Sequence, residues 1–477
     1  MKPLLSEEIQ RAVRGRWLAR GGSEKILGVS IDSRTAGAGQ LFVAIVGKNH
    51  DGHNHLAAAA AAGCTLAIIG KDFDAPLSVL QRFRVGALAV NDTTTALGDL
   101  AAFYRRQLPA AVVAVTGSNG KSTVRRMIHH ILSKRLTGSC GLKNHNNHIG
   151  VPLTLLAVEP KDDFVVCEMG TSSHGEIARL SQIGQPNVAV ITSVSPSHLE
   201  GLGSLTHVAV EKAALLTHLA ARGLAIVNAD SKELDRALSN YKCNVIRFGA
   251  SAGASLRLTS YTPVDTGQEF VINNRLKVTL SVCGRHNACN AMAAIAVAQR
   301  FGFGQGEAAK ALADYAGMEM RLQFIDLGGH STLINDAYNA NPASMLAAAD
   351  VLADSAGRRR VMIVGDMLEL GGKSQALHED VGRKLATMKI DLLIGAGNLG
   401  ARMAAAAAEA GLAAEAFKSP EHLADHLDGL LHRGDTILIK GSRGSQMERL
   451  IEPITAALSA APAAPRVRKA HPKGGAK

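Results

Sequence analysis

Residues 116–123 carry the residue types that hold phosphate groups. Their sequence, TGSNGKST, follows the apolar run 110–115, so a buried strand, a tight glycine turn and a helix start are expected in that order. In such a turn the backbone N–H groups point at phosphate oxygens, the Lys121 ammonium reaches the terminal phosphates and the Ser122 hydroxyl can ligate Mg²⁺. We therefore predict that this segment binds ATP or a related nucleotide.

The loop departs from the usual phosphate-binding pattern at one position. That pattern has a glycine five residues before Gly120, where this chain has Val115, so the spacing is a shorter G-x-x-G-K-S. The alternative interpretation is a glycine-rich turn with a solvent-exposed lysine. The strand, turn and helix signals occur together, which favours nucleotide binding. The residues expected to contact the nucleotide are Gly117, Ser118, Asn119, Gly120, Lys121, Ser122 and Thr123.

Two further polar side chains follow predicted strands and can assist the loop. The strand at 164–168 ends in Glu168, and the strand at 188–191 leads to His198. Parallel strands bind ligands at the edge where their carboxyl ends meet, so Glu168 can hold Mg²⁺ beside Ser122. Glu168 can equally cap the next turn, and a histidine taken alone is more often a hydrogen-bonded structural residue than a metal ligand.

Strand and helix signals alternate along the chain and predict an α/β fold with three domains in series. The domains are expected at 1–108, 109–322 and 323–458, followed by a disordered basic tail at 459–477. The central domain should hold a mostly parallel sheet with helices on both faces, and the C-terminal domain should be Rossmann-like. Other strands are expected at 41–46, 66–69, 224–227, 331–334, 361–364, 392–394 and 436–439. Helices are expected at 56–62, 95–107 and 287–300, and antiparallel runs within 245–282.

The composition is that of a soluble globular protein of 477 residues, long enough for about three domains. The six cysteines show no C-x-x-C spacing, which argues against structural zinc and against a disulfide framework. No apolar run approaches the roughly 20 residues of a membrane helix, and no export signal is evident. The net charge of +11 includes five charges within 466–477, and the remaining excess suits anionic nucleotides better than nucleic acid. We expect a cytoplasmic protein without nucleic-acid partners or membrane insertion.

The chain resembles the Mur ligase family through a series of motifs that occur in the family's order. They are DSR at 32–34, GSNGKST at 117–123, NHNNHIGVP at 144–152, EMG at 168–170, HLEG at 198–201, GRHN at 284–287, DAYNANP at 336–342, GDMLELG at 365–371 and KGSR at 440–443. The resemblance runs from about residue 27 to residue 455. The NNxIGVP and GDMxELG segments resemble those of the members that add D-Ala-D-Ala to UDP-MurNAc-tripeptide.

The resemblance implies an ATP-dependent ligase that forms a C–N bond between these two substrates, in the final cytoplasmic step of peptidoglycan precursor synthesis. A carboxylate is a poor acyl donor because oxide would have to leave, whereas its acyl phosphate, made with the ATP γ-phosphoryl, can be attacked by an amine. By resemblance, Lys121 contacts the β- and γ-phosphates, Ser122 and Glu168 bind one Mg²⁺, and His198 helps bind a second. The resemblance also places Asn287, Asp336, Tyr338 and Asn339 near the nucleotide.

The resemblance assigns further roles to a lysine and to substrate-binding residues. Lys212 matches a lysine that many of these ligases carry as a carbamate, which is an anionic ligand where an ammonium would repel Mg²⁺; the alternative is a solvated helix lysine. Ser33 and Arg34 resemble the uridine-nucleotide grip in the first domain, although this segment also suits a turn cap. Asn146 and Asn147 are expected near the substrate. The third domain is expected to bind the incoming dipeptide, and the protein to act as a monomer.

Two other functions are alternatives. Folylpolyglutamate synthetase shares the central and C-terminal domains of the family, but it lacks a separate uridine-binding first domain, and the DSR motif at 32–34 counts against it. A P-loop ATPase that acts as a switch without a ligase reaction would need neither an amino-acid-binding third domain nor a second metal site.

Overall fold

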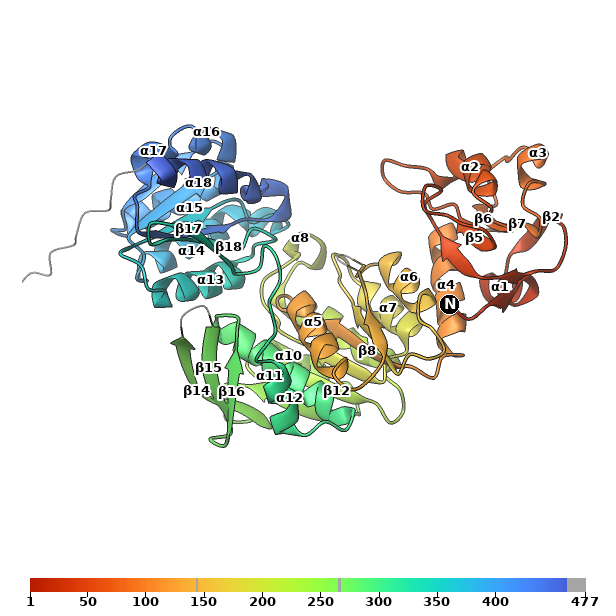
Figure 1. Cartoon of the computed structure of the whole chain (residues 1–477), viewed down its shortest axis with the longest axis horizontal. Coiled ribbons are helices and arrows are strands. Elements are labelled where there is room, and N and C mark those ends of the chain that lie inside the picture. Colours follow the sequence, from red (N-terminus) through yellow and green to blue (C-terminus); the bar gives the residue numbers. More distant parts are fainter. Residues whose placement is uncertain (143–144, 265–266, 461–477) are drawn as a thin grey trace, which may run out of the picture. The chain divides into compact units, whose positions relative to one another are not determined.

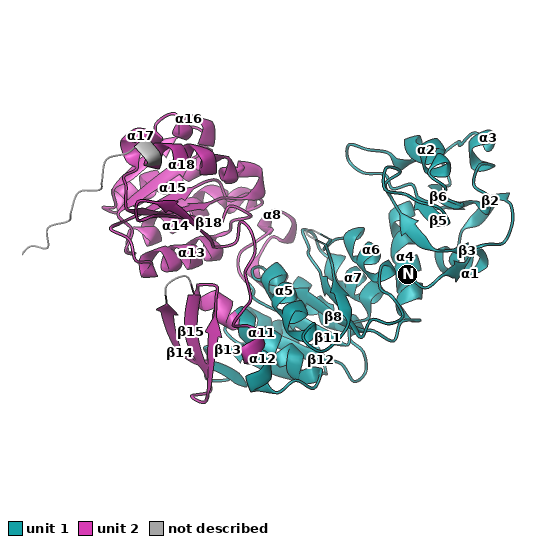
Figure 2. Ribbon diagram, in the orientation of Figure 1, with its two compact units in different colours: residues 1–194, 209–257, 290–308 teal, residues 195–208, 258–289, 309–477 magenta. Residues whose placement is uncertain are grey.

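The computed structural model describes residues 1–142, 145–264 and 267–460 (Figure 1). The chain forms two compact units (Figure 2), of which unit 1 contains 1–194, 209–257 and 290–308 and unit 2 contains 195–208, 258–289 and 309–477. Both units combine sheets with helices, which confirms the predicted α/β class. Asn144, the first residue of the NHNNHIGVP motif, and the predicted tail beyond residue 460 lie outside the described residues.

The N-terminal part of unit 1 is a five-stranded sheet. Its order is β2 (Arg16–Arg20), β7 (Gly86–Val90), β6 (Leu66–Gly70), β5 (Gln40–Val43) and β4 (Gly28–Ser30). All pairs are parallel except the antiparallel edge pair β2–β7. The accompanying elements are the short pair β1 (Leu4–Leu5) and β3 (Lys25–Ile26) and the helices α1 (Ser6–Val13), α2 (Leu56–Ala61), α3 (Leu77–Leu80) and α4 (Thr93–Arg105). Helix α4 begins two residues before its predicted start because the Asp92 side chain caps it by accepting from the Thr95 N–H.

The central part of unit 1 is a parallel sheet that places the phosphate loop. Its order is β9 (Gly138–Cys140), β10 (Phe164–Glu168), β8 (Ala111–Thr116), β11 (Val188–Ile191), β12 (Leu224–Asn228) and β13 (Asn244–Gly249). The chain moves from β8 to one side of the sheet for β9 and β10, and then to the other side for β11. Strand β8 therefore lies at the topological switch point, where ligands bind at the carboxyl ends of parallel strands.

The helices of unit 1 cover these sheets through one continuous core. They are α5 (Lys121–Leu132), α6 (Gly150–Leu156), α7 (Glu176–Gly184) and α10 (Lys232–Leu238), with α9 (Leu205–Ala213), α11 (Arg285–Arg300) and α12 (Gln305–Ala311) shared between the units. The core joins Leu100 of α4 to Leu180 of α7. A buried hydrogen bond of 2.7 Å from the Tyr104 hydroxyl to the Val158 carbonyl oxygen also crosses this junction. The N-terminal and central parts of unit 1 are thus packed together.

The antiparallel pairing expected within 245–282 begins later than predicted. Strand β13 is parallel to β12, and β14 (Leu256–Val264) is parallel to β13 over its first two residues. The antiparallel pairing begins with β15 (Gly267–Ile272), which pairs with β14, and continues with β16 (Leu276–Leu280), which pairs with β15.

The C-terminal part of unit 2 is a six-stranded sheet buried on both faces. Its order is β17 (Gln323–Gly328), β18 (Ser331–Asn335), β22 (Asp435–Lys440), β19 (Arg359–Val364), β20 (Leu392–Ala396) and β21 (Ala414–Phe417), and only β17 is antiparallel. Its helices are α13 (Pro342–Asp354), α14 (Ser374–Leu385), α15 (Asn398–Glu409), α16 (Pro420–Ala424), α17 (Leu427–Leu430) and α18 (Ile451–Ala460). Successive residues such as Leu333 and Ile334 enter separate cores on opposite faces, as in doubly wound sheets. The predicted Rossmann-like form is confirmed, with α18 reaching two residues into the predicted tail. Within the described ranges, no helix is long and apolar enough to span a membrane.

Candidate active site

The phosphate loop connects β8 to α5 and depends on two glycines. Gly117 has φ +150° and Gly120 has φ +82°, a backbone region that disfavours side chains. A Cβ atom at Gly117 would lie 1.9 Å from Thr192 Oγ1, and one at Gly120 would lie 2.4 Å from Asn290 Oδ1. The Lys121 ammonium donates to the Gly117 carbonyl oxygen at 2.8 Å, so it reaches back over the loop. The predicted strand, turn and helix start are all present.

Residues that follow β11 hold the loop in place. The Ser118 N–H donates to the Ser193 carbonyl oxygen at 2.8 Å, and the Asn119 N–H donates to Ser193 Oγ at 2.9 Å. Thr192 Oγ1 donates to the Asn119 carbonyl oxygen at 2.5 Å. Sequence reasoning assigned no role to Thr192, Ser193 or Asn290, because only the pairing of β8 with β11 and the approach of α11 bring them to the loop.

Ser122 and Glu168 meet beneath the loop, as the sequence predicts. The Ser122 hydroxyl donates to Glu168 Oε2 at 2.7 Å, and the Asn146 amide donates to Glu168 Oε1 at 3.0 Å. Glu168 is buried, and Nε of the buried Arg125 lies 3.9 Å from its Oε2. Asn146 is thereby brought to the site, whereas Asn147 accepts from the Ile149 and Gly150 N–H groups and so shapes the turn that leads into α6.

The donor set at this position suits Mg²⁺. A hydroxyl and a carboxylate supply hard oxygen atoms, which this ion prefers. Among the described residues, no three His, Cys, Asp or Glu side chains gather into a metal-binding group. Mg²⁺ is usually held by one or two carboxylates together with substrate phosphates, and Ser122 and Glu168 beside a phosphate loop match that pattern.

Lys212 lies in α9 and is 1% exposed, so it is not a solvated helix lysine. Burial lowers the pKa of its ammonium well below the ordinary 10.5, and the positive charge of Lys121 lowers it further. Its neighbour Glu211 raises this pKa, but the Glu211 carboxylate is occupied by the Gly175 and Ile177 N–H groups, both at 2.8 Å. Burial and the charge of Lys121 therefore favour the neutral amine over the ammonium.

His198 belongs to unit 2, in the segment that leads from β11 to α8 (Leu199–Leu202). Its Nδ1 lies 2.5 Å from Oε2 of Glu369, and this contact lowers the pKa of the Glu369 carboxyl. The Glu200 N–H also donates to the Glu369 carbonyl oxygen at 3.3 Å. Glu369 lies in the GDMLELG motif, and sequence reasoning gave it no individual role.

Three residues of the third domain are expected near the nucleotide, and they follow the end of β18: Asp336, Tyr338 and Asn339. Lys440 is 3% exposed and donates to Asp336 Oδ2 at 2.6 Å and to the Asn339 carbonyl oxygen at 2.9 Å. The Arg321 guanidinium lies 4.2 Å from the centre of the Tyr338 ring, a cation–π contact. Asn287 is buried in the first turn of α11, where its amide donates to the Cys283 carbonyl oxygen at 2.7 Å.

Ser33 and Arg34 follow β4 in the N-terminal sheet. The Arg34 guanidinium donates two hydrogen bonds to the Asp32 carboxylate, from Nε to Oδ1 at 2.9 Å and from Nη2 to Oδ2 at 2.6 Å. The Arg34 side chain is 86% exposed. This pairing lowers the pKa of Asp32 to about 2. The Arg34 N–H also donates to Asp32 Oδ1, so the predicted turn cap is present and the guanidinium remains accessible to solvent.

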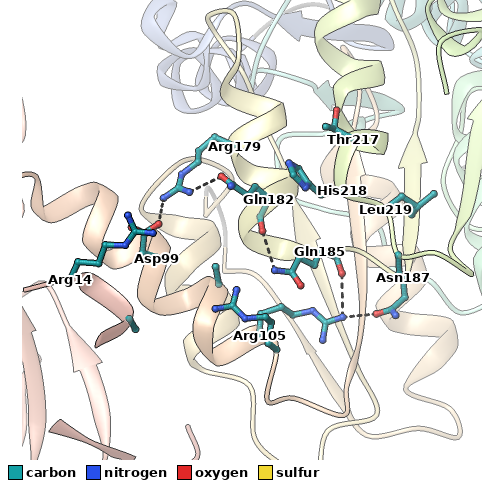
Figure 3. A pocket seen from close by; sticks show the side chains of 14 residues that line it. Arg14, Asp99, Arg105, Arg179, Gln182, Gln185, Asn187, Thr217, His218 and Leu219 are labelled. Atoms are coloured by element: carbon teal, nitrogen blue, oxygen red, sulfur yellow. Dashed lines mark hydrogen bonds and ion pairs between the residues drawn. The ribbon is translucent and has the colours of Figure 1, made fainter. Parts of the chain in front are cut away.

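A cavity of about 1020 Å³ lies in unit 1 away from the phosphate loop (Figure 3). It is lined by α4, α7 and the segment 217–220, and includes Arg105, Arg179 and Asn187. Asn187 directly precedes β11, and its Oδ1 accepts from Arg105 Nη2 at 2.7 Å and from the Val112 N–H at 2.9 Å. The cavity therefore lies at the amino ends of the strands, whereas the phosphate loop follows their carboxyl ends.

Comparisons with known proteins match this chain to Mur ligases along most of its length. Three family models match the chain: the Mur ligase family catalytic domain over residues 25–105, the Mur ligase middle domain over 115–298 and the Mur ligase glutamate ligase domain over 320–443. The UDP-N-acetylmuramoyl-tripeptide–D-alanyl-D-alanine ligase of Bacillus subtilis is 34% identical over 90% of this chain and 93% of its own length. The protein of the same name from Escherichia coli is 36% identical over 89% of this chain and 92% of its own length.

Solved structures show the same relationship. The crystal structure of MurF from Acinetobacter baumannii superimposes with a TM-score of 0.87 and 32% identity, covering 96% of this chain and 99% of that one. MurF ligase from Thermotoga maritima in complex with ADP gives a TM-score of 0.80 and 25% identity over 91% of this chain and 98% of that one. With three family models in sequence and relatives matched over about nine-tenths of the chain, this protein belongs to the Mur ligase family.

Proposed function

We propose that this chain is the ATP- and Mg²⁺-dependent ligase that joins D-alanyl-D-alanine to UDP-N-acetylmuramoyl-tripeptide, in the final cytoplasmic step of peptidoglycan precursor synthesis. The relatives matched over about nine-tenths of the chain carry this name. The observation that carries the proposal is the hydrogen bond of 2.7 Å between Ser122, in the phosphate loop, and Glu168, at the end of the neighbouring strand. A hydroxyl and a carboxylate held together beside a phosphate loop offer the hard oxygen atoms that a nucleotide-bound cation prefers, which supports the proposal.

The proposed reaction proceeds in two steps. The terminal carboxylate of the tripeptide attacks the γ-phosphorus of ATP, the bond from that phosphorus to the bridging oxygen breaks, and ADP leaves. The amine of D-Ala-D-Ala then attacks the acyl carbon, the bond from that carbon to the phosphate oxygen breaks, and the nitrogen loses a proton. The products are the amide, ADP and inorganic phosphate, which retains one oxygen of the original carboxylate.

The phosphate loop supports the first step by binding and orienting the nucleotide. The proposed nucleotide contacts are Gly117, Ser118, Asn119, Gly120, Lys121, Ser122 and Thr123, together with Asn287, Asp336, Tyr338 and Asn339. Lys121 supplies positive charge toward the terminal phosphates, and the backbone N–H groups supply fixed dipoles. Ser33 and Arg34 are proposed to bind the uridine nucleotide, and Asn146 and Asn147 the peptide side of the substrate.

The residues proposed to hold Mg²⁺ are Ser122 and Glu168 for a first ion and His198 for a second. When bound, Mg²⁺ offsets the negative charge on the phosphates during transfer. Lys212 is proposed to carry a carbamate, and its burial supports this because only a neutral amine can attack the carbon of CO₂. In that step the amine nitrogen bonds to the carbon of CO₂, one C=O π bond opens to leave a negatively charged oxygen, and the nitrogen releases a proton, so a neutral amine becomes an anionic carbamate.

We further propose the domain limits 1–108 for uridine-nucleotide binding, 109–322 for ATP binding and 323–458 for dipeptide binding. The three family models cover 25–105, 115–298 and 320–443, so each falls almost entirely within one of the proposed domains, which supports this division. A folylpolyglutamate synthase is among the similar solved structures, but at 19% identity it shares only the fold. Curated relatives with 34–36% identity favour the peptidoglycan substrates.

Omission of each substrate tests the proposed function. Phosphate release from ATP is measured with both substrates, with each one alone and with neither, and the product mass is recorded. We expect sustained release and a new amide only with both substrates. Release without either substrate would indicate an ATPase switch, and release with a folate and glutamate would indicate the folylpolyglutamate reaction.

A further inference from the structure

The GDMLELG motif at 365–371 is part of the family resemblance, yet the proposed function gives it no task. It follows β19, and hydrogen bonds fix it on the N-terminal side of Glu369. The Met367 N–H donates to His378 Nε2 at 2.8 Å, and the Leu368 N–H donates to Ser442 Oγ at 2.9 Å. On the other side Leu370 is buried. Glu369 is thus an exposed carboxylate on a well-held loop.

Glu369 has an unusual backbone. Its φ is +63°, a left-handed conformation that an L-residue adopts only at an energetic cost. His198, on the opposing segment, also has a positive φ, of +51°. The Leu202 N–H donates to the His198 carbonyl oxygen at 2.9 Å, and the Leu202 side chain is buried, which fixes the histidine backbone. Two residues in disfavoured conformations, each held by its neighbours, therefore face one another, a pattern that is concentrated at functional sites.

The segments that hold His198 and Glu369 contact each other through both side-chain and main-chain atoms. Nδ1 of His198 lies 2.5 Å from Oε2 of Glu369, and the Glu200 N–H donates to the Glu369 carbonyl oxygen at 3.3 Å. A Cβ atom at Gly371 would lie 3.2 Å from Cα of Glu200, so the backbones are close there as well. His198 Nδ1 is buried, and its close contact with Glu369 falls outside hydrogen-bond geometry.

This arrangement determines which ring nitrogen of His198 can bind a cation. A carboxylate beside Nδ1 favours the proton on that nitrogen and leaves the lone pair on Nε2, and metal-binding histidines commonly have such a carboxylate partner. We propose that Glu369 is a positioning residue that orients His198 and fixes its tautomer for the second metal ion. The proposal rests on the metal role proposed above for His198, and it gives the GDMLELG motif a specific task.

The obvious competing explanation is that Glu369 only fastens two loops. The hydrogen bond from the Glu200 N–H separates the positioning role from this fastening role. It uses the Glu369 carbonyl oxygen, so a change of the Glu369 side chain leaves it in place. Glu369→Gln keeps the shape and the main-chain contact but removes the carboxylate. Glu200→Gln is the matched control, since it removes one carboxylate from the same segment, and this side chain has no ion pair or hydrogen bond to any described residue.

The first measurement is the tautomer of His198 in the full-length, metal-free protein. Histidine ¹⁵N chemical shifts are recorded by NMR, and the His198 signals are identified by their loss in His198→Gln. We expect the Nδ1–H tautomer in the wild type and in Glu200→Gln, and a shift toward the Nε2–H tautomer in Glu369→Gln. Unchanged His198 shifts in Glu369→Gln would overturn the proposal.

The second measurement is Mn²⁺ binding in the presence of ADP, with Mn²⁺ as the probe for Mg²⁺ and electron paramagnetic resonance as the readout. We expect Glu369→Gln to weaken the weaker of two Mn²⁺ sites by about 10- to 100-fold and to leave the tighter site unchanged. His198→Gln should weaken the same site. If His198→Gln has no effect on either site, the metal role of His198 is wrong. If only Glu369→Gln has no effect, the positioning role is wrong while the metal role stands.

Discussion

The Ser122 hydroxyl donates a hydrogen bond of 2.7 Å to Glu168, a residue 46 positions further along the chain. The two residues meet because β8 and β10 are parallel neighbours whose carboxyl ends share one sheet edge. Asn146 occupies the other carboxylate oxygen, so the direction of the Glu168 side chain is set from both sides. This pair links the phosphate loop to the proposed Mg²⁺ site.

Glu168→Gln should abolish most of the ligase activity, with circular dichroism recorded to check folding because the buried Arg125 loses a nearby carboxylate. The amide keeps the size of the side chain but loses the charge that would bind the cation. We expect kcat to fall by about 100-fold or more, since metal stabilisation of a transferred phosphoryl group is worth several kcal/mol. Steady-state kinetics measure this, with Glu307→Gln as the control because that carboxylate pairs at the surface with Arg135. Equal activity of the two variants would contradict the metal role of Glu168.

Gly117→Ala should prevent nucleotide binding. The new Cβ would lie 1.9 Å from Thr192 Oγ1, and φ of +150° is unfavourable for alanine, so the loop must move. Calorimetric titration with ADP measures the effect, and we expect no detectable affinity. Gly253→Ala is the matched control because nothing lies within 4 Å of its added Cβ, and this variant should bind ADP like the wild type. Normal ADP affinity in Gly117→Ala would show that the loop is not the nucleotide site.

Lys212→Met should increase stability in CO₂-free buffer, in a pH-dependent way. Burial lowers the pKa of Lys212 in the folded protein below the 10.5 expected for the unfolded chain, so the unfolded state binds more protons between these two values. The wild type therefore gains stability as the pH rises through this window, whereas methionine does not titrate. Urea unfolding at several pH values should show a stability advantage for Lys212→Met at neutral pH that shrinks toward pH 10.5.

The carbamate proposed for Lys212 is tested by measuring ligase activity. Lys212→Ala should lose activity, which short-chain carboxylic acids should partly restore by replacing the carbamate. Full activity of Lys212→Ala without any added acid would refute the carbamate. A pH-independent stability difference in the preceding experiment would refute the depressed pKa instead, so the two claims fail separately.

Asp336→Asn should destabilise the C-terminal part of unit 2. It removes the carboxylate that pairs with the buried Lys440 at 2.6 Å, and loss of one partner from a buried ion pair costs about 3–5 kcal/mol. Denaturant unfolding measures this cost. The double variant Asp336→Asn/Lys440→Met should recover part of it, because no buried charge is left unpaired. A single variant as stable as the wild type would mean that Lys440 finds another partner.

The sequence was most informative where strands are buried on both faces. The strands Phe164–Glu168 and Val188–Ile191 have the predicted bounds, because each is a continuous apolar run that only a covered parallel sheet explains. The edge strand Gln323–Gly328 was not predicted, since its alternating polar residues give little signal. Strand β13 lies in the region expected to be antiparallel but pairs parallel with β12, because its own residues do not show in which direction the neighbouring strand runs.

In the candidate site, too, some contacts could be predicted from the sequence and others could not. Ser122 and Glu168 could be predicted together because both follow buried strands at one sheet edge. Asn146 and Asn147 could not be told apart in the sequence, yet one contacts Glu168 and the other shapes a turn. The contact of His198 with Glu369 joins motifs that are far apart along the chain, and no local pattern encodes such a contact.

The acyl-phosphate reaction is tested most directly by transfer of oxygen from the tripeptide. The terminal carboxylate is labelled with ¹⁸O, the full reaction is run with ATP, Mg²⁺ and D-Ala-D-Ala, and the inorganic phosphate is examined by mass spectrometry. The proposed mechanism predicts one ¹⁸O atom in each phosphate released, because the carboxylate oxygen that attacks the γ-phosphorus leaves with it. Unlabelled phosphate accompanying formation of the amide would contradict the acyl-phosphate mechanism.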